Sequence, residues 1–239
     1  MAIVSNTVGY LDGDVLLEAF FAFDDAISTR RPAVLINHTW AGRDAFVAEK
    51  AKQLAALGYV GFAVDMYGKG VLGTSVAENA QLMQPFMDNR DMLQKRMLAA
   101  YANVKLLPWV DDSRIAAIGF CFGGLCALDL ARTGANIKGA VSFHGLLYPP
   151  GNSEGNTISA KILALHGHDD PLATPQQVLA FQQEMTAAGA DWQLHSYGHT
   201  QHAFTNPVAN DPARGMMYSA DADRRSWLAM TQFLAEIFA

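Results

Sequence analysis

The chain has 239 residues, of which 51% are hydrophobic and 17% are charged, a balance typical of a globular protein with a large apolar core. Its formal net charge of −6, with no run rich in lysine or arginine, argues against a surface that binds nucleic acid or an anionic membrane. We therefore expect a small-molecule partner.

Signal and anchor segments are not expected. The first ten residues, MAIVSNTVGY, have neither a basic segment nor an apolar core, so we expect no secretory signal. No apolar run approaches the roughly 18 residues of a membrane-spanning helix. The two cysteines, Cys121 and Cys126, are a poor basis for a disulfide framework. We expect a cytoplasmic protein with free thiols that is a monomer or a homodimer.

The first half of the chain alternates short apolar strands with helical segments. AVLINH, over 33–38, is apolar throughout, as expected for a strand covered on both faces. Asp44 is placed to cap a helix that ends at Gly58, and residues 59–68 form the next expected strand. A mostly helical segment is expected from 75 to 107, with a break at Pro85.

The second half continues this alternation. Expected strands lie at 114–120, 137–145, 161–170 and 192–198, and expected helices follow at 123–133, 175–189 and 221–237. Residues 149–157 form an expected surface loop, and the first 30 residues an N-terminal β element. Because parallel strands need helical crossovers, this order predicts one α/β domain over 1–239, with a mostly parallel central sheet and helices on both faces.

Cys121 lies in GFCFGG, directly after an expected strand and before an expected helix. Small residues two positions away on each side are typical of a strained turn that projects a nucleophile. The N–H groups at a helix N-terminus favour the reactive thiolate. The alternative is a buried structural thiol, which the strand, turn and helix order disfavours. Cys126 lies within the helix, where core packing is expected.

A nucleophile of this kind needs a histidine base and an acid that orients it, and the expected chain order is nucleophile, acid, histidine. HGHDDP supplies the acid after one strand, and we favour Asp170 over Asp169 because Asp170 directly precedes Pro171. GHTQHAF supplies the histidine after the next strand, and we prefer His202 to His199.

The other histidines have competing interpretations. His195 lies within a strand, and His166 and His168 flank the acid. His144 ends a strand and is placed to line a pocket. A metal site of His199, His202 and Asp170 is weakly indicated, because a metal-binding histidine pair or clustered thiols are missing and the cysteine turn would have no role. We expect no metal and no cofactor.

Six segments of the chain form a recognisable set: HTWAGRD, LGYVGFAVDMYGKG, GFCFGG, FHG, GHDDP and HAF. With these segments the chain resembles the dienelactone hydrolase family of α/β-hydrolases, and the resemblance extends from about Arg31 to the C-terminus. It implies the α/β-hydrolase fold, a triad of Cys121, His202 and Asp170, and an oxyanion hole from the backbone N–H groups of Trp40 and Phe122. The implied reaction is hydrolysis of a small ester or lactone through a thioester.

The chain departs from the family pattern at two positions. Family members have a glutamate just before the oxyanion-hole residue and an arginine four residues after the histidine, where this chain has Thr39 and Asn206. We therefore expect His202 to pair with the thiol directly. Arg90 and Arg96 are candidates for an anion contact, although surface salt bridging is the expected role of each.

Further pocket residues are expected from their places at strand ends. The candidates for substrate contact are Thr39, Tyr67, Arg90, His144 and Phe204, and the aromatic residues expected to line a pocket are Trp40, Tyr67, Phe122, Phe143 and Phe204. Two other functions compete with hydrolysis. One is a non-catalytic small-molecule binder on the same fold, and the other is a redox-active thiol, which Cys126 is poorly placed to resolve.

Overall fold

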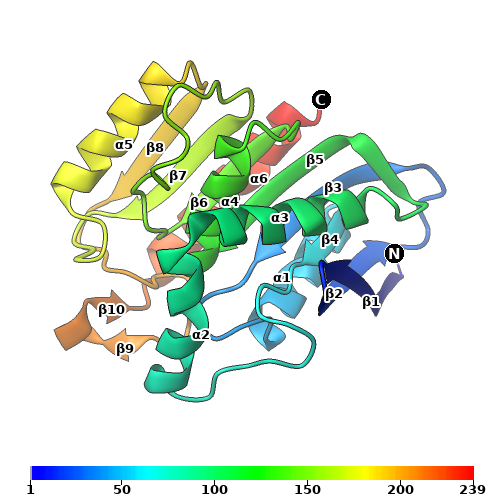
Figure 1. Ribbon diagram of the computed structural model, residues 1–239, viewed down its shortest axis with the longest axis horizontal. Coiled ribbons are helices and arrows are strands. Elements are labelled where there is room, and N and C mark those ends of the chain that lie inside the picture. The colour runs from blue at the N-terminus through cyan, green and yellow to red at the C-terminus, as the bar shows by residue number, and fades with distance from the viewer. Residues whose placement is uncertain (1) are drawn as a thin grey trace. The chain divides into compact units, whose positions relative to one another are not determined.

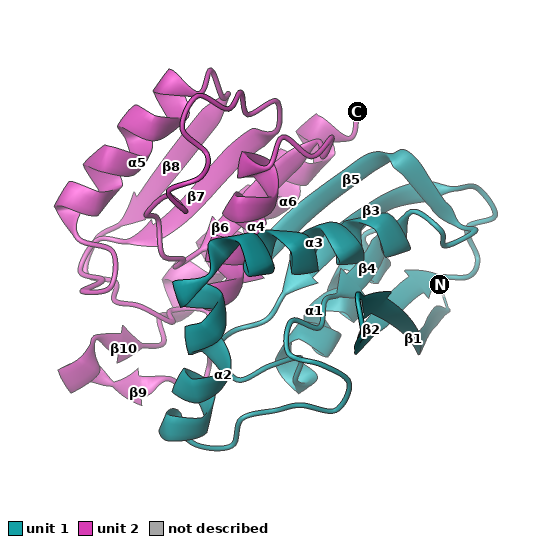
Figure 2. Cartoon of the chain, viewed as in Figure 1, with its two compact units in different colours: residues 1–118 teal, residues 119–239 magenta. Residues whose placement is uncertain are grey.

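The computed structural model describes residues 2–239, and the chain divides into two compact units (Figure 2). Unit 1 comprises residues 1–118 and unit 2 comprises residues 119–239. Strand β5 (Val110–Phe120) begins in unit 1, and its last two residues belong to unit 2. The expectation of a single domain stays a prediction.

Unit 1 is built from antiparallel and parallel strands with helices between them (Figure 1). Its elements before β5 are β1 (Ile3–Asp12), β2 (Val15–Asp24), β3 (Arg31–Asn37), α1 (Ala45–Ala56), β4 (Val60–Ala63), α2 (Val76–Asp88) and α3 (Arg90–Val104). The strand order is β1-β2-β4-β3-β5. Strands β1 and β2, and β2 and β4, are antiparallel, whereas β3 and β4 are parallel.

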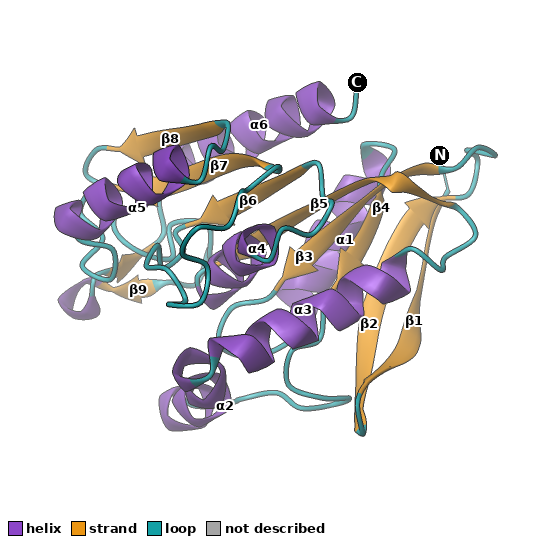
Figure 3. Ribbon diagram, turned by 45° about the horizontal axis from the view of Figure 1, so that its top comes forward, coloured by secondary structure: helices purple, strands orange, loops and turns teal. Residues whose placement is uncertain are grey.

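The two helices α1 and α3 cover opposite faces of the unit 1 strands (Figure 3). Strands β3 and β4 are consequently buried at every residue, which is why their sequences are apolar runs without alternation. Asp44 caps α1 as expected, since its side chain accepts the N–H groups of Phe46 and Val47.

Unit 2 contains a parallel arrangement of strands with a helix after most of them. Its elements after β5 are α4 (Phe122–Arg132), β6 (Gly139–Phe143), β7 (Lys161–Gly167), α5 (Pro175–Ala187), β8 (Trp192–Tyr197), β9 (Asn210–Asp211), β10 (Met216–Met217) and α6 (Ala220–Ile237). Strands β6, β7 and β8 are consecutive neighbours and are parallel. Strands β9 and β10 form a separate antiparallel pair.

Residues of β6 show that α4 and α6 lie on opposite faces of its sheet. A Cβ atom on Gly139 would lie 2.8 Å from the side chains of Phe233 and Ile237 in α6. The Oγ atom of Ser142, three residues later, lies 2.6 Å from the Cβ position of Gly124 in α4. Successive residues of a strand face opposite sides of the sheet, so Gly139 and Ser142, which are three residues apart, face opposite sides. The two helices that contact them therefore cover opposite faces. The predicted α/β class, mostly parallel with helices on both faces, is confirmed.

The expected helix break at Pro85 is wrong. Helix α2 continues through Pro85 to Asp88, and Asn89 separates it from α3. A proline removes one backbone hydrogen bond but does not have to end a helix. Asn89 takes a non-helical conformation, and its side chain accepts the N–H of Met92 as the cap of α3.

The strand expected over 59–68 is shorter in the structure and ends at Ala63. Asp65 organises the residues that follow, because its carboxylate accepts the N–H groups of Tyr67 and Gly68, each at 3.0 Å. It also accepts the N–H of Glu18 at 3.0 Å. A carboxylate that accepts backbone N–H groups a few residues further along the chain stabilises a turn in place of the hydrogen bonds between strands, and β4 therefore ends before Asp65.

Among residues 2–239, no helix combines the length and the apolar character that crossing a bilayer requires.

A buried ion cluster ties α4 to α5 within unit 2. Arg132 is completely buried and forms two hydrogen bonds to Glu184, at 2.8 and 2.7 Å, and one to Asp129 at 3.1 Å. Its guanidinium also donates to the carbonyl oxygen of Leu147 at 2.9 Å. The charge of the fully buried Asp129 is therefore balanced by Arg132.

We expect Arg132→Met to lower the free energy of unfolding by about 3–5 kcal/mol, because it leaves a buried carboxylate without its counter-charge. Urea denaturation followed by circular dichroism measures the change. Adding Asp129→Asn should recover part of the loss, since that change removes the buried charge. A loss below about 1 kcal/mol in the single variant would show that the cluster contributes little.

Candidate active site

Cys121 occupies a strained turn between β5 and α4. Its backbone angles are φ 56° and ψ −117°, in the region that favours glycine. Its N–H donates to the carbonyl oxygen of Phe143 at 3.0 Å, and its own carbonyl oxygen accepts the N–H of Gly124 at 3.0 Å. Such a conformation costs about 1–3 kcal/mol and persists where the surroundings fix it. The turn places a half-buried thiol at the N-terminal end of α4.

The glycines around Cys121 are required by close backbone contacts. A Cβ atom on Gly119 would lie 1.9 Å from the carbonyl oxygen of Gly123. A Cβ atom on Gly124 would lie 2.6 Å from Oγ of Ser142 and 2.9 Å from Cα of Gly145. No side chain fits at either position, so Gly119 and Gly124 are steric conditions for this turn.

Asp170 and His202 form a buried pair. Nδ1–H of His202 donates to Oδ2 of Asp170 at 2.7 Å, and the two residues are 1% and 3% exposed. The other carboxylate oxygen, Oδ1, accepts the N–H of Leu172 at 2.8 Å, which fixes the carboxylate plane. Asp169 is exposed. The structure thus brings together the aspartate and the histidine that the sequence favoured.

The loop that carries His202 is held by the β9–β10 segment, which the sequence did not predict. The N–H of His202 donates to the carbonyl oxygen of Gly215 at 2.8 Å, and its carbonyl oxygen accepts the N–H of Met217 at 3.0 Å. Ala203 has φ 59°, so the chain turns sharply directly after His202. Strands of two residues give no periodic pattern from which this support could be predicted.

The charge of His202 depends on Cys121. Burial alone would lower the pKa of His202, but the negative charge of Cys121 and the hydrogen bonds to Asp170 and Cys121 outweigh it and raise this pKa to about 10. Nδ1 is bonded to Asp170, and Nε2 is buried without a hydrogen-bond partner among residues 2–239. Because Nδ1 is engaged, Nε2 is the ring nitrogen that remains available for a reaction partner.

A second group of interactions centres on His144, which contacts His202, Phe204 and Thr205. Nε2 of His144 lies 2.8 Å from Oγ1 of Thr205, and the ring of His144 meets the ring of His202 edge-on at 5.0 Å. Phe204 is fully buried, and its ring also lies 5.0 Å from that of His144. The structure therefore places His144 and Phe204 in the interior of unit 2, with almost no surface exposed. Sequence reasoning missed Thr205, which no spacing pattern marks.

Phe122 and Phe143, which the sequence placed in the pocket lining, are also fully buried in unit 2. Their rings therefore pack in the interior of this unit. Cys126 is buried in α4, as expected, and both cysteines are free thiols.

Of the remaining histidines of unit 2, only His166 is buried close to the Asp170–His202 pair. His168, His195 and His199 are exposed, whereas His166 is buried near Asp170. Burial lowers the pKa of His166, and the charge of Asp170 opposes this only partly. Within residues 2–239, no group of three or more His, Cys, Asp and Glu side chains is arranged to hold a metal ion.

Trp40, Thr39 and Tyr67 are half-buried residues of unit 1. The hydroxyl group of Tyr67 donates to the carbonyl oxygen of Trp40 at 3.0 Å, so these two residues fix each other. Trp40 belongs to unit 1 and Phe122 to unit 2. The oxyanion hole that would use their N–H groups stays a prediction.

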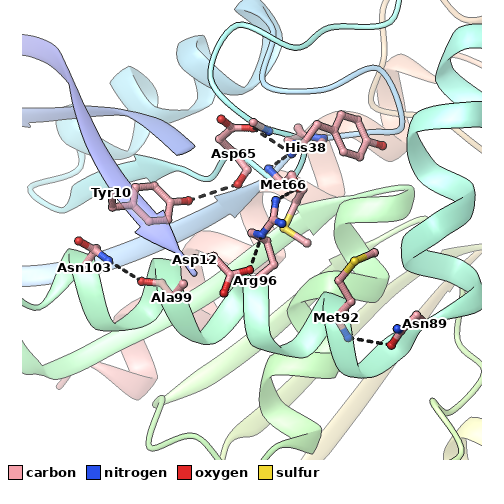
Figure 4. Close-up of polar contacts among 12 residues, drawn as sticks. Tyr10, Asp12, His38, Asp65, Met66, Asn89, Met92, Arg96, Ala99 and Asn103 are labelled. Atoms are coloured by element: carbon pink, nitrogen blue, oxygen red, sulfur yellow. Dashed lines mark hydrogen bonds and ion pairs between the residues drawn. The ribbon is translucent and has the colours of Figure 1, made fainter. Parts of the chain in front are cut away.

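The turn after β4 is fixed through both backbone polar groups of Met66. His38 accepts the N–H of Met66 on Nε2 at 3.3 Å, and its Nδ1–H donates to the carbonyl oxygen of Thr39. Arg96 donates to the carbonyl oxygen of Met66 at 2.6 Å and to Asp12 at 2.7 Å. Figure 4 shows His38 and Arg96 converging on Met66. Burial lowers the pKa of His38, which suits a neutral ring that donates through one nitrogen and accepts through the other.

The expected surface role of Arg90 and Arg96 is wrong. Both side chains are buried, at 7% and 5% exposure. Arg96 pairs with Asp12 and lies over the ring of Phe86 at 5.5 Å. An ion pair between positions 84 residues apart in the chain cannot be read from local sequence, which explains the error.

The chain is similar to several known proteins. The model of the dienelactone hydrolase family matches residues 17–238. A probable 2-oxo-3-(5-oxofuran-2-ylidene)propanoate lactonase from Bradyrhizobium sp is 29% identical over 188 residues, which is 74% of this chain and 75% of that protein. An uncharacterised protein from Caenorhabditis elegans is 39% identical over 158 residues, which is 64% of this chain and 98% of that protein.

The chain also resembles solved structures over its whole length. A dienelactone hydrolase-like promiscuous phosphotriesterase from metagenomic libraries is 35% identical, with a TM-score of 0.95 and full coverage of both chains. The α/β-hydrolase fold that the sequence predicted is thereby confirmed.

The raised pKa of His202 gives a pH prediction. We expect its ring to stay protonated from pH 6.5 to 9 and to lose the proton near pH 10, as measured by NMR titration of labelled histidine. Because this pKa lies above the unfolded value, the stabilisation it brings is complete below about pH 6.5 and is lost as pH rises through 10. Cys121→Ser should lower the midpoint, since it removes the thiolate charge. An unchanged midpoint would exclude the ion pair.

Proposed function

Because the chain belongs to the dienelactone hydrolase family of α/β-hydrolases, we propose that it hydrolyses small carboxylic esters or lactones through a thioester on Cys121. The observation that carries the proposal is the buried 2.7 Å bond between His202 and Asp170, in a histidine whose charge depends on Cys121. A nucleophile, a base and an orienting acid together make an acyl-transfer triad.

In the first half of the reaction the Cys121 thiolate attacks the carbonyl carbon of the substrate. The carbonyl electron pair moves to oxygen, and the backbone N–H groups of Phe122 and Trp40 are the proposed donors to this oxyanion; one such donor contributes about 3–4 kcal/mol in other enzymes. His202 then gives its Nε2 proton to the alkoxide as the carbon–oxygen bond breaks. This leaves a thioester and a neutral histidine.

Hydrolysis of the thioester reverses the roles. Neutral His202 takes a proton from water at Nε2, and the resulting hydroxide attacks the thioester carbonyl. The carbon–sulfur bond breaks, the acid is released, and Cys121 returns as a thiolate beside the imidazolium. Asp170 holds the tautomer with the proton on Nδ1 and stabilises the cation each time that it forms.

The pairing of Cys121 with His202 also accounts for the residue at position 39. A chain with Thr39 has no carboxylate at this place to accept the thiol proton. The ion pair with His202 supplies the thiolate directly, because the proton that leaves sulfur is held on Nε2. This is the activation route that the sequence predicts, and the charge of His202 supports it.

Substrate contacts are proposed for the half-buried residues of unit 1. Thr39 offers a hydroxyl group, and Tyr67 and Trp40 offer aromatic surface. Arg90 is buried, so an anion contact by its guanidinium would require the substrate to reach the interior of this unit. The interior positions of His144 and Phe204 favour a supporting role instead of substrate contact.

We expect Cys121→Ala to lower kcat/KM for p-nitrophenyl acetate by about 10³-fold or more, because the reaction loses its nucleophile. The release of p-nitrophenol at 405 nm follows the reaction. Cys126→Ala is the matched control, since it removes the other thiol, which lies in the helix that follows Cys121, and it should keep at least a third of the activity. If the wild-type protein turned over no member of a broad ester and lactone panel, the alternative of a non-catalytic binder would gain support.

A phosphotriester is a second candidate substrate. The observation in its favour is the full-length match, at 35% identity, to a structure described as a promiscuous phosphotriesterase. The same thiolate would attack phosphorus and expel an aryl oxide, which His202 would protonate, and water would then cleave the sulfur–phosphorus bond.

We expect slow turnover of paraoxon, with kcat/KM at least about 10²-fold below that of p-nitrophenyl acetate, because the proposed site is arranged for a planar carbonyl. Nitrophenol release measures both rates, and Cys121→Ala should abolish both. Paraoxon hydrolysis that survives in this variant would contradict a shared nucleophile.

A further inference from the structure

His144 is strained and buried at the end of β6. Its φ of 39° lies in the region that favours glycine, and its side chain is 1% exposed. Its N–H donates to the carbonyl oxygen of Leu165 on β7 at 2.8 Å, so the strained residue continues the pairing of these two strands. Backbone strain combined with a buried polar ring costs stability, and it therefore points to a role for this side chain.

The contacts of His144 converge on the loop that carries His202. Its Nε2 atom lies 2.8 Å from Oγ1 of Thr205, three residues after His202. Its ring meets the ring of His202 at 5.0 Å with an interplanar angle of 70°, and the ring of Phe204 at 5.0 Å and 79°. One side chain thus connects the end of β6 to both ends of the segment 202–205.

This connection opposes a specific movement. Asp170 fixes one edge of the His202 ring through Nδ1, and a ring held at one atom can still tilt about that bond. The ring of His144 meets the His202 ring edge-on at 5.0 Å and so limits this tilting, and the bond to Thr205 keeps the His144 ring in place. Nε2 of His202 is thereby kept aimed at Cys121.

The charge of His144 suits this role. Burial and the positive charge of His202 hold the pKa of His144 well below its usual range, so the ring is neutral. A second cation at this place would repel the imidazolium that Cys121 and Asp170 stabilise. His166, which is also buried and feels the charges of Asp170 and His202, has a lowered pKa too, because burial outweighs the charge of Asp170.

We propose that His144, held by Thr205, is a positioning residue that keeps the His202 ring aligned between Asp170 and Cys121. It acts through His202 and does not touch the substrate. The inference rests on the proposed function for its activity test, and it has a second test that needs no substrate.

The experiment is a double-mutant cycle. His144→Phe keeps a ring but removes the hydrogen bond, and Thr205→Val keeps the shape of the side chain but removes the hydroxyl group. We expect each variant to lower kcat for p-nitrophenyl acetate about tenfold, with KM within twofold, since one hydrogen bond accounts for about this factor. The double variant should be no more than about threefold slower than the slower single variant, because both changes remove one bond.

The second test is alkylation of Cys121 by iodoacetamide across pH 5–9. A misaligned imidazolium stabilises the thiolate less, so the rate at pH 6 should fall about threefold or more in both single variants. His195→Phe is the matched control, because it makes the same substitution at an exposed position of β8 in the same unit. It should change neither kcat nor the alkylation profile.

The outcomes separate this inference from the proposed function. Multiplied losses of about a hundredfold in the double variant, or a rise in KM with unchanged kcat, would overturn the positioning role. If His144→Phe did not fold, as judged by circular dichroism, Thr205→Val would carry the test alone, and normal kcat and alkylation in that variant would overturn it. If the wild-type protein hydrolysed no ester, the proposed function would fail, and the alkylation profile would still decide the role of His144.

Discussion

The buried hydrogen bond between Asp170 and His202 fixes the tautomer of the His202 ring and helps to raise its pKa. Burial of a histidine ring disfavours its cation, and the carboxylate and the thiolate together reverse this preference. Because Nδ1 is bonded to Asp170, the tautomer is fixed and Nε2 is left for the thiol. The same bond draws the loop after β8 against the loop after β7, so the parallel order of these two strands brings acid and base together.

Four residues of unit 2 that are not glycine have positive φ: Cys121, His144, His199 and Ala203. Two of them are held by backbone bonds to neighbouring strands, since the N–H of Cys121 donates to Phe143 and that of His144 donates to Leu165. Strain of this kind persists only where a rigid frame prevents relaxation. The strands β6 and β7 provide that frame, and the fold uses part of its stability to aim these side chains.

Much of the fold and of the candidate site in unit 2 could be predicted from local sequence. Gly119 reflects a contact with Gly123, four residues away, and the order of cysteine, aspartate and histidine follows the order of parallel strands. The errors concern contacts between distant positions. The burial of Arg96 depends on Asp12, and the support of His202 depends on strands of two residues, neither of which leaves a periodic pattern. Thr205 is one of many threonines until the fold places it beside His144.

The spacing of histidines in the sequence does not decide which of them favours the charged form. Three buried histidines of unit 2 occupy similar places in the sequence. His144 directly follows β6, His166 lies near the end of β7, and His202 lies in the loop after β8. Burial pushes each toward the neutral form, and the first two have lowered pKa values. His202 differs because it bonds a carboxylate directly, and the interactions with Asp170 and Cys121 that raise its pKa together exceed the effect of burial. The ring centroids of His144 and His202 lie 5.0 Å apart, and the charge of His202 adds to burial in lowering the pKa of His144, so the two rings favour opposite charge states.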